Sequence, residues 1–104
     1  MSAMLDDKGL DDTALDASSV IALQRWVRLR FDPVRDRHVL LAPERVLYPC
    51  PTTVAILEAL AEPRSLSDLV GGLAGEFEAP RALIEADVRR LLADLLLQRL
   101  VVVR

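Results

Sequence analysis

The spacing of hydrophobic residues changes near the middle of this chain, and two prolines, Pro49 and Pro51, mark the change. Before them, over residues 26–48, apolar and polar residues alternate with a period of two, which is typical of half-buried strands. After them, apolar residues recur at helical spacing as far as about residue 98. Because proline cannot donate to a strand ladder, the two prolines end the strand region. The chain therefore divides into a β half and an α half.

We expect three short strands in the first half. In the first strand, Val27, Leu29 and Phe31 point to one face and the arginines between them to the other. A turn at residues 32–37 leads to a second strand at residues 38–41, and Pro43-Glu44 leads to a third at residues 45–48. Strands joined by such tight connections form an antiparallel meander.

The first two helices of the second half are marked by their ends. The first runs over about residues 51–61 and is closed by Pro63. Ser65 is the expected N-cap of the second, with Asp68 three positions later. Gly71-Gly72 lies in the middle of this second helix, where helix packing or a helical break explains the pair better than a phosphate-binding loop.

The third helix is long and unusually apolar. It starts at Pro80, extends to about residue 98, and is followed by a terminal strand or hydrophobic strap at residues 100–103. The order of elements predicts an α+β fold, with a three-stranded antiparallel sheet followed by three helices. Such an order is compatible with a winged helix-turn-helix-like arrangement.

The acidic charge of the chain is concentrated near its start. Residues 1–22 contain five Asp and one Lys, although the whole chain has a net charge of only −3. We interpret residues 1–22 as a flexible acidic tail or linker, and residues 23–104 as the folded domain. A short helix over residues 16–24, capped by Asp16 or Ser18, is an alternative for the end of this tail.

The location of the protein is suggested by three features. Asp6 and Asp7 stand where a secretory signal carries Lys or Arg. No apolar run approaches the ~18 residues that a membrane span needs. A lone cysteine, Cys50, cannot form an internal disulfide. These features predict a cytoplasmic protein without a membrane segment.

Groups that could carry out catalysis are few. Cys50 and His38 are the only pair worth considering, and neither a third orienting group nor an oxyanion hole accompanies them. One Cys and one His also fall short of a four-ligand zinc site. We therefore expect no catalytic residue, no metal site and no cofactor.

Arginines are abundant in the predicted sheet. Six arginines against three acidic residues give residues 25–45 a net charge of +3. These arginines suggest a binding surface for an acidic peptide or for nucleic acid, or else an ordinary solvated sheet face. The acidic residues of the third helix, Glu85, Asp87 and Asp94, suit a peptide better than a DNA duplex.

An open edge strand beside a leucine-rich helix is typical of peptide recognition by strand addition.

Several short segments of the chain match one known family. The most specific is LLAPERVL at residues 40–47, followed by Pro49. The others are Val54-Ala55-Ile56-Leu57, Arg64-Ser65-Leu66, Phe77-Glu78-Ala79-Pro80, Asp87-Val88, Leu92 and Leu100-Val101. Over roughly residues 26–103 the chain thus resembles the PqqD family, whose domains are also called RiPP recognition elements.

The resemblance implies a non-enzymatic peptide chaperone with a winged helix-turn-helix-like fold. PqqD proteins bind the precursor peptide PqqA and present it to the radical SAM enzyme PqqE in pyrroloquinoline quinone biosynthesis. Some are fused behind the oxidase PqqC, and residues 1–22 would suit such a linker. By resemblance, the peptide adds as a strand beside residues 45–48 and rests against the third helix. The implied peptide-binding residues are Arg45, Val46, Leu47 and Tyr48 on the strand, and Ile84, Val88, Leu91 and Leu95 on the helix, where some of the four belong to the core instead.

Three positions depart from the family pattern. Leu60-Ala61-Glu62 replaces Cys-Asp-Gly after the first helix, Cys50-Pro51-Thr52 replaces an acidic helix start, and Arg99 replaces a helix-ending Gly. These departures leave open a relative that recognises another ribosomal precursor peptide. The remaining alternatives are a winged-helix nucleic-acid-binding module and a dimer that pairs with its own copy through the edge strand or through residues 100–103. The sequence is compatible with a monomer or a homodimer.

Overall fold

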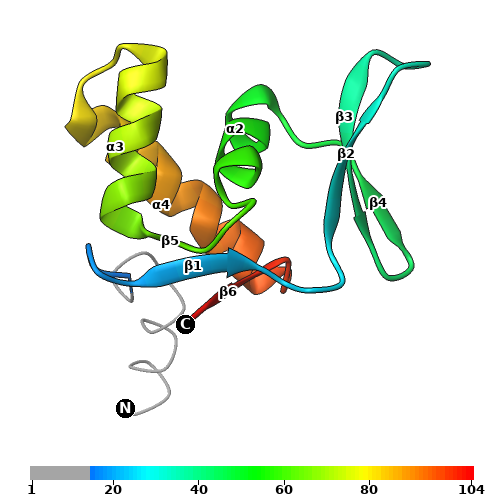
Figure 1. Cartoon of the computed structure of the whole chain (residues 1–104), viewed down its shortest axis with the longest axis horizontal. Helices are drawn as coiled ribbons and strands as arrows, with labels where there is room; N and C mark the ends of the chain where they lie inside the picture. The colour runs from blue at the N-terminus through cyan, green and yellow to red at the C-terminus, as the bar shows by residue number, and fades with distance from the viewer. Residues whose placement is uncertain (1–14) are drawn as a thin grey trace.

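A three-stranded meander and three helices make up most of the domain (Figure 1). The computed structural model describes residues 15–104. The meander is antiparallel, in the order β2-β3-β4, and consists of β2 (Arg28–Asp32), β3 (Arg37–Ala42) and β4 (Arg45–Leu47). The helices are α2 (Pro51–Ala59), α3 (Leu66–Phe77) and α4 (Arg81–Leu97). The predicted α+β fold, three antiparallel strands followed by three helices, is confirmed.

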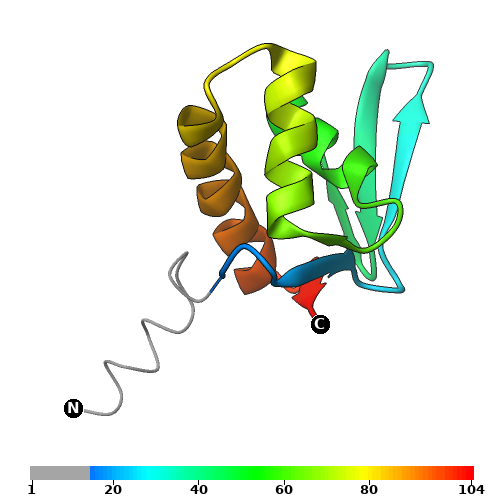
Figure 2. The same cartoon turned by 60° about the vertical axis from the view of Figure 1, so that its left-hand side comes forward.

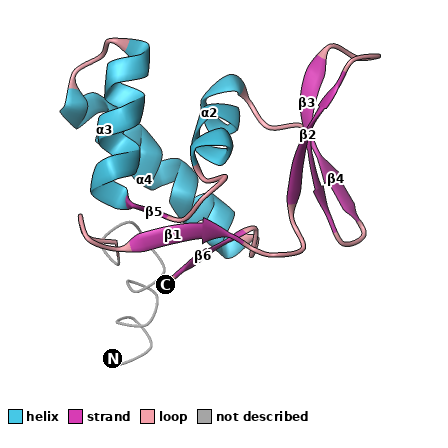
Figure 3. Ribbon diagram, viewed as in Figure 1, coloured by secondary structure: helices cyan, strands magenta, loops and turns pink. Residues whose placement is uncertain are grey.

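A second small sheet joins segments that lie far apart in the sequence (Figure 3). Its antiparallel order is β5-β1-β6, formed by β1 (Val20–Leu23), β5 (Arg64–Ser65) and β6 (Val101–Val103). The terminal strand expected at residues 100–103 is present, but it pairs with β1 and not with the meander. Neither β1 nor β5 was predicted, because each is short and finds its partner only through the tertiary fold.

The predicted start of the folded domain at residue 23 is wrong for the part of the tail that the structure describes. Leu15 and Ile21 are buried at 4% and 0% exposure, and Arg89 donates a hydrogen bond to the Leu15 carbonyl (Nη1–O 2.6 Å). The expected helix over residues 16–24 is also wrong. Asp16 accepts the N–H of Ser18 at 2.9 Å and closes a turn, after which the chain enters β1. Residues 1–14 lie outside the described residues, so an acidic tail there stays a prediction.

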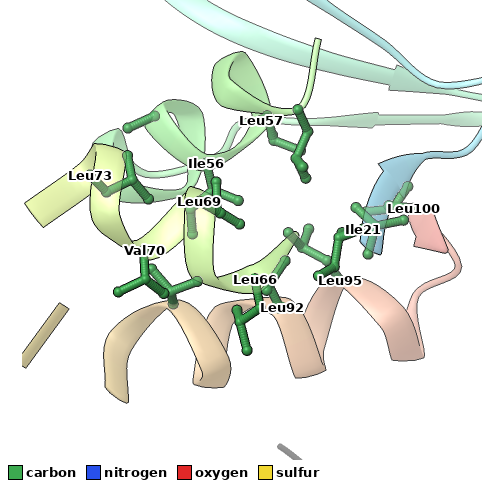
Figure 4. Packing of buried hydrophobic residues seen from close by; sticks show 14 of the residues in the cluster. Ile21, Ile56, Leu57, Leu66, Leu69, Val70, Leu73, Leu92, Leu95 and Leu100 are labelled. Atoms are coloured by element: carbon green, nitrogen blue, oxygen red, sulfur yellow. The ribbon is translucent and has the colours of Figure 1, made fainter. Parts of the chain in front are cut away.

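The hydrophobic core receives side chains from all three helices and from both sheets (Figure 4). Ile56 of α2, Leu69 of α3 and Leu92 of α4 are almost completely buried. Burial of each such side chain stabilises the fold by about 1.5–3 kcal/mol. The meander contributes Leu40, and the second sheet contributes Ile21. The apolar stripe of α4 is thus a core stripe along much of its length.

Helices α3 and α4 lie side by side (Figure 2), and the side chain of Arg81 on α4 reaches Gly71 and Ser67 on α3. A Cβ at Gly71 would lie 3.1 Å from Nη1 of Arg81, closer than an ordinary van der Waals contact. Arg81 reaches from α4 to donate hydrogen bonds to the carbonyl and the hydroxyl of Ser67. Ser65 caps α3 as predicted, because its hydroxyl accepts the N–H of Asp68 at 3.1 Å.

The end of α4 is closed by a left-handed residue that is not glycine. Arg99 has φ 61°, its N–H donates to the carbonyl of Leu96, and the N–H of Leu100 donates to the carbonyl of Leu95. These two bonds form a Schellman motif, which normally places Gly at the Arg99 position. The motif reverses the chain so that Val101 enters β6 beside β1.

We predict that Arg99→Gly stabilises the domain by about 0.5–1 kcal/mol, because glycine adopts positive φ without a Cβ clash. Thermal or urea unfolding monitored by circular dichroism measures the change. The matched control is Ala86→Gly at an exposed position of α4, which should lower stability by about 1 kcal/mol. A destabilised Arg99→Gly variant would contradict the assignment of the cap.

Candidate functional site

Strand β4 forms an edge of the meander. Its one partner among the described strands is β3, and the register pairs Ala42 with Arg45, Leu41 with Val46 and Leu40 with Leu47. The turn between the strands is Pro43-Glu44, with Glu44 at φ 61°. Proline at the first turn position and a positive φ at the second are typical of a type II turn. The sequence therefore builds a tight hairpin whose outer strand has an open edge.

The backbone of Val46 faces that open edge. In a hairpin with a two-residue turn, the residues that flank the turn form a hydrogen-bonded pair, here Ala42 and Arg45. Because such pairs alternate along an antiparallel ladder, the next pair, Leu41 and Val46, does not exchange hydrogen bonds. The N–H and C=O of Val46 therefore point away from β3, where an added strand could pair with them.

Arg45 connects this edge strand to the end of α4. Its Nη2 donates to the carbonyl of Gln98 at 2.9 Å, and its Nη1 donates to Oε1 of the same residue at 3.3 Å. The amide of Gln98 in turn donates to Asp94 at 2.9 Å. A cation at a helix C-terminus also interacts favourably with the helix dipole. Arg45 thus holds β4 at a set position relative to α4.

A hollow of about 220 Å³ opens between β4, the start of α2 and the end of α4. Leucines of the meander and leucines at and after the end of α4 form much of its apolar lining, and Asp94 and Gln98 supply polar groups. The full lining is Leu40, Leu47, Tyr48, Pro49, Cys50, Thr53, Asp94, Leu95, Gln98 and Leu100. The volume is below the ~300–1,000 Å³ of small-molecule sites, so the hollow suits one or two apolar side chains of a larger ligand.

The structure brings together the strand residues of the predicted site and one of its helix residues. Leu47, Tyr48 and Leu95 line the hollow, while Arg45 makes the connection to α4. Val46 is 57% exposed at the open edge.

The remaining helix residues of the predicted site, Ile84, Val88 and Leu91, do not line this hollow. Val88 is a core residue at 1% exposure, and Ile84 and Leu91 are partly buried against the core. This agrees with the expectation that some of the helix residues belong to the core.

Sequence reasoning missed several residues that line the hollow. Leu40 lies opposite Leu47 in the meander, and Gln98, the C-cap of α4, follows Leu95 by three positions, so both were within reach of a spacing argument. Cys50 and Thr53 were not, because their position depends on the angle at which α2 leaves β4. Leu100 is placed by the turn at the end of α4.

The thiol of Cys50 lies at the N-terminus of α2, close to Thr53. The Sγ and Oγ1 atoms are 3.2 Å apart. The hydroxyl of Thr53, followed by the backbone N–H groups of Thr53 and Thr52, lowers the pKa of the Cys50 thiol, and desolvation opposes this only in part. Cys50 is an exposed, free cysteine.

His38, which the sequence paired with Cys50 as a candidate catalytic residue, has different contacts. Its Nε2 lies 3.5 Å from Oε2 of Glu58 on α2, and its ring packs edge-on against Phe31 with the centroids 5.2 Å apart. Cys50 and His38 thus have separate partners, Thr53 and Glu58.

A second hollow lies beside β2, at the opposite edge of the meander. Phe31 and His38 line it from the sheet, and Leu57 and Glu58 line it from α2. Both edges of the meander therefore border a hollow, and of these two hollows it is the hollow at β4 that α4 also lines.

Within residues 15–104, the side chains form no group of three or more His, Cys, Asp or Glu that could hold a metal ion. Over the same residues, every helix is too short or too polar to cross a membrane.

Comparisons with known proteins agree on one family. The family model of "Coenzyme PQQ synthesis protein D (PqqD)" matches residues 37–101. A Rhizobium meliloti relative named PqqA binding protein is 41% identical over 90 residues, covering 86% of this chain and 92% of the relative. The bifunctional coenzyme PQQ synthesis protein C/D of Methylorubrum extorquens is 42% identical over 89 residues, which cover 86% of this chain and 24% of that protein.

A solved structure is similar over nearly the whole chain. It is the solution NMR structure of the PqqD truncation of Methylobacterium extorquens PqqCD, described as a functional and stand-alone RiPP recognition element. The TM-score is 0.73 at 41% identity, and the match covers 88% of this chain and 97% of that one.

We predict that Thr53→Val raises the pKa of the Cys50 thiol, because the hydroxyl that stabilises the thiolate is lost. The rate of alkylation by iodoacetamide, measured from pH 6 to pH 10, should reach half its maximum at a higher pH in the variant. Thr52→Val is the control, since it keeps the backbone N–H that faces the thiol. Superimposable profiles for the wild type and Thr53→Val would refute the assignment.

The lowered pKa of the Cys50 thiol also makes the stability of the folded state depend on pH. The pKa is lower in the folded state than in the unfolded state, so the thiolate contributes its full stabilisation above the unfolded-state pKa. That contribution is lost as the pH falls through the folded pKa.

Proposed function

The chain belongs to the PqqD family, and on that premise we propose that it is a peptide chaperone that binds the precursor peptide PqqA by strand addition at β4. The family is one of peptide-binding proteins and not of enzymes. The Rhizobium meliloti relative carries the name PqqA binding protein, and its match extends over 92% of its length. Binding of PqqA in pyrroloquinoline quinone biosynthesis is therefore the activity that the relatives support.

The observation that carries the proposal is the position of the open edge of β4 beside an apolar hollow. Backbone groups of Val46 face the edge, which supplies the hydrogen bonds that an added strand needs. Alternate side chains of that strand would point toward Leu47, Leu95 and the other leucines of the hollow. Backbone pairing then gives affinity, and the fit of apolar side chains gives selectivity.

Arg45 has a positioning role in this proposal. An open edge strand of only three residues is held by one neighbour, β3, and the two hydrogen bonds from Arg45 to Gln98 add a second attachment. The width of the gap between β4 and α4 is thereby set before the peptide arrives, which lowers the entropic cost of binding.

The second part of the proposal is that the chain presents the bound peptide to the radical SAM enzyme PqqE. We propose that this takes place in the cytoplasm. A peptide added at an edge strand keeps one edge and half of its side chains accessible, which a second protein can use. The Methylorubrum extorquens relative combines the C and D proteins in one chain, which supports an association with PqqC as well.

The contacts of α4 argue against DNA as the ligand. A recognition helix needs exposed donors, yet Arg89 donates to Glu85 at 2.9 Å and Arg90 lies 3.4 Å from Asp87. The acidic groups would also repel phosphates. Another precursor peptide is the alternative that the family pattern leaves open.

We expect an NMR titration of the labelled chain with unlabelled PqqA to give saturable shifts at residues 45–50 and 94–100, around the hollow. Val46→Pro should lower the affinity at least about tenfold, because proline removes the N–H at the open edge. Val46→Thr is the matched control, since it keeps the N–H and the branched side chain, and it should bind PqqA within about twofold of the wild type.

Either of two results would contradict the proposal that PqqA adds as a strand at β4. One is unchanged affinity in a Val46→Pro variant whose spectrum shows a folded domain. The other is the absence of shifts in the wild type at millimolar PqqA, while a different precursor peptide produces them around β4.

A further inference from the structure

The meander has a second face, turned away from the helices. Leu29, Leu40 and Leu47 point inward and pack on the core. Because successive side chains of a strand alternate, their neighbours point to the opposite side. We call that side the outer face; by the register it carries Arg28, Arg30, Arg37, Val39, Leu41 and Val46, and the guanidinium of Arg28 donates to the carbonyls of Arg25 and Val27. In Figure 1 no described helix lies against it.

The outer face combines an aliphatic strip with arginines. The register places Leu41 between Arg28 and Val46, and it places Val39 opposite Arg30. Asp32 lies at the tip of the same sheet, but its carboxylate pairs with Arg35 at 3.1 Å. The cationic groups beside the strip are therefore not neutralised by that acid.

Arg37 extends the surface to the edge of the sheet. Its guanidinium stacks over the ring of Tyr48, 4.3 Å from the ring centroid. Tyr48 also lines the hollow. The outer face is thus continuous, at Tyr48 and Val46, with the edge at which a peptide would add.

We propose that the outer face is the docking surface for the enzyme that modifies the bound peptide, and that this enzyme offers an acidic patch next to an apolar one. The inference rests on the proposed function. Strand addition at β4 extends the meander by one strand, so every second peptide side chain joins the outer face next to Val46. An enzyme docked there contacts the chaperone and the outward side chains of the peptide together.

The composition of the face favours a protein over nucleic acid. Phosphates need donors throughout a contact surface, whereas Val39, Leu41 and Val46 form an aliphatic strip that reaches the β4 edge, with the β2 arginines on one side of it. An apolar strip bordered by charged side chains is typical of a protein interface. The arginines would steer an acidic partner and fix its orientation.

The test uses the full chain, PqqA and purified PqqE. Arg30→Glu reverses a charge on β2, on the side of the outer face that is opposite the β4 edge. We expect it to weaken binding of PqqE to the PqqA-saturated chain at least about tenfold, measured by isothermal titration calorimetry, and to leave PqqA affinity within about twofold. The matched control is Arg90→Glu on α4, which makes the same change in net charge and should leave both affinities unchanged.

The outcomes separate the two proposals. Failure of the wild type to bind PqqA overturns the proposed function. Normal PqqA binding with PqqE affinity that is equal in the wild type and Arg30→Glu, or with no PqqE binding at all, overturns only the docking surface. Tight binding of a 20-base-pair duplex that is lost in Arg30→Glu would also overturn it and identify nucleic acid as the occupant.

Discussion

The carbonyl groups at the C-terminal end of α4 need hydrogen-bond donors, and the way they obtain them organises the rest of the molecule. The N–H groups of Arg99 and Leu100 satisfy the carbonyls of Leu96 and Leu95, and this turn sends the chain into β6. The carbonyl of Gln98 is satisfied by Arg45 of the edge strand. One helix end thus closes the second sheet and holds the edge strand of the first.

The parts of the fold that depend on local sequence could be predicted. Ser65 was expected to cap α3 and does so, and the Pro43-Glu44 turn between β3 and β4 also lies where it was expected. The second sheet was missed for a physical reason. The four residues of β1 are too few to distinguish strand from helix by periodicity, and their partners, β5 and β6, lie more than forty residues away.

The candidate site was predictable on its strand side and only partly on its helix side. Leu47 and Tyr48 follow from the edge position of a short strand that precedes two prolines. On α4, the spacing showed which residues form an apolar stripe, but not what covers each part of it. Val88 is covered by the core, and Leu95, two turns later, reaches the hollow. That difference depends on how α4 packs against the other elements, which a single sequence does not encode locally.

The central claim is that a peptide pairs with β4, and hydrogen exchange of the Val46 amide tests it most directly. The amide faces an open edge in the free chain, so it should exchange rapidly, and saturating PqqA should slow its exchange at least about tenfold. Amides of β2, at the opposite edge beside the second hollow, should be unaffected. Protection that appears on β2 while Val46 exchanges as before would contradict the claim and move the peptide to the other edge of the sheet.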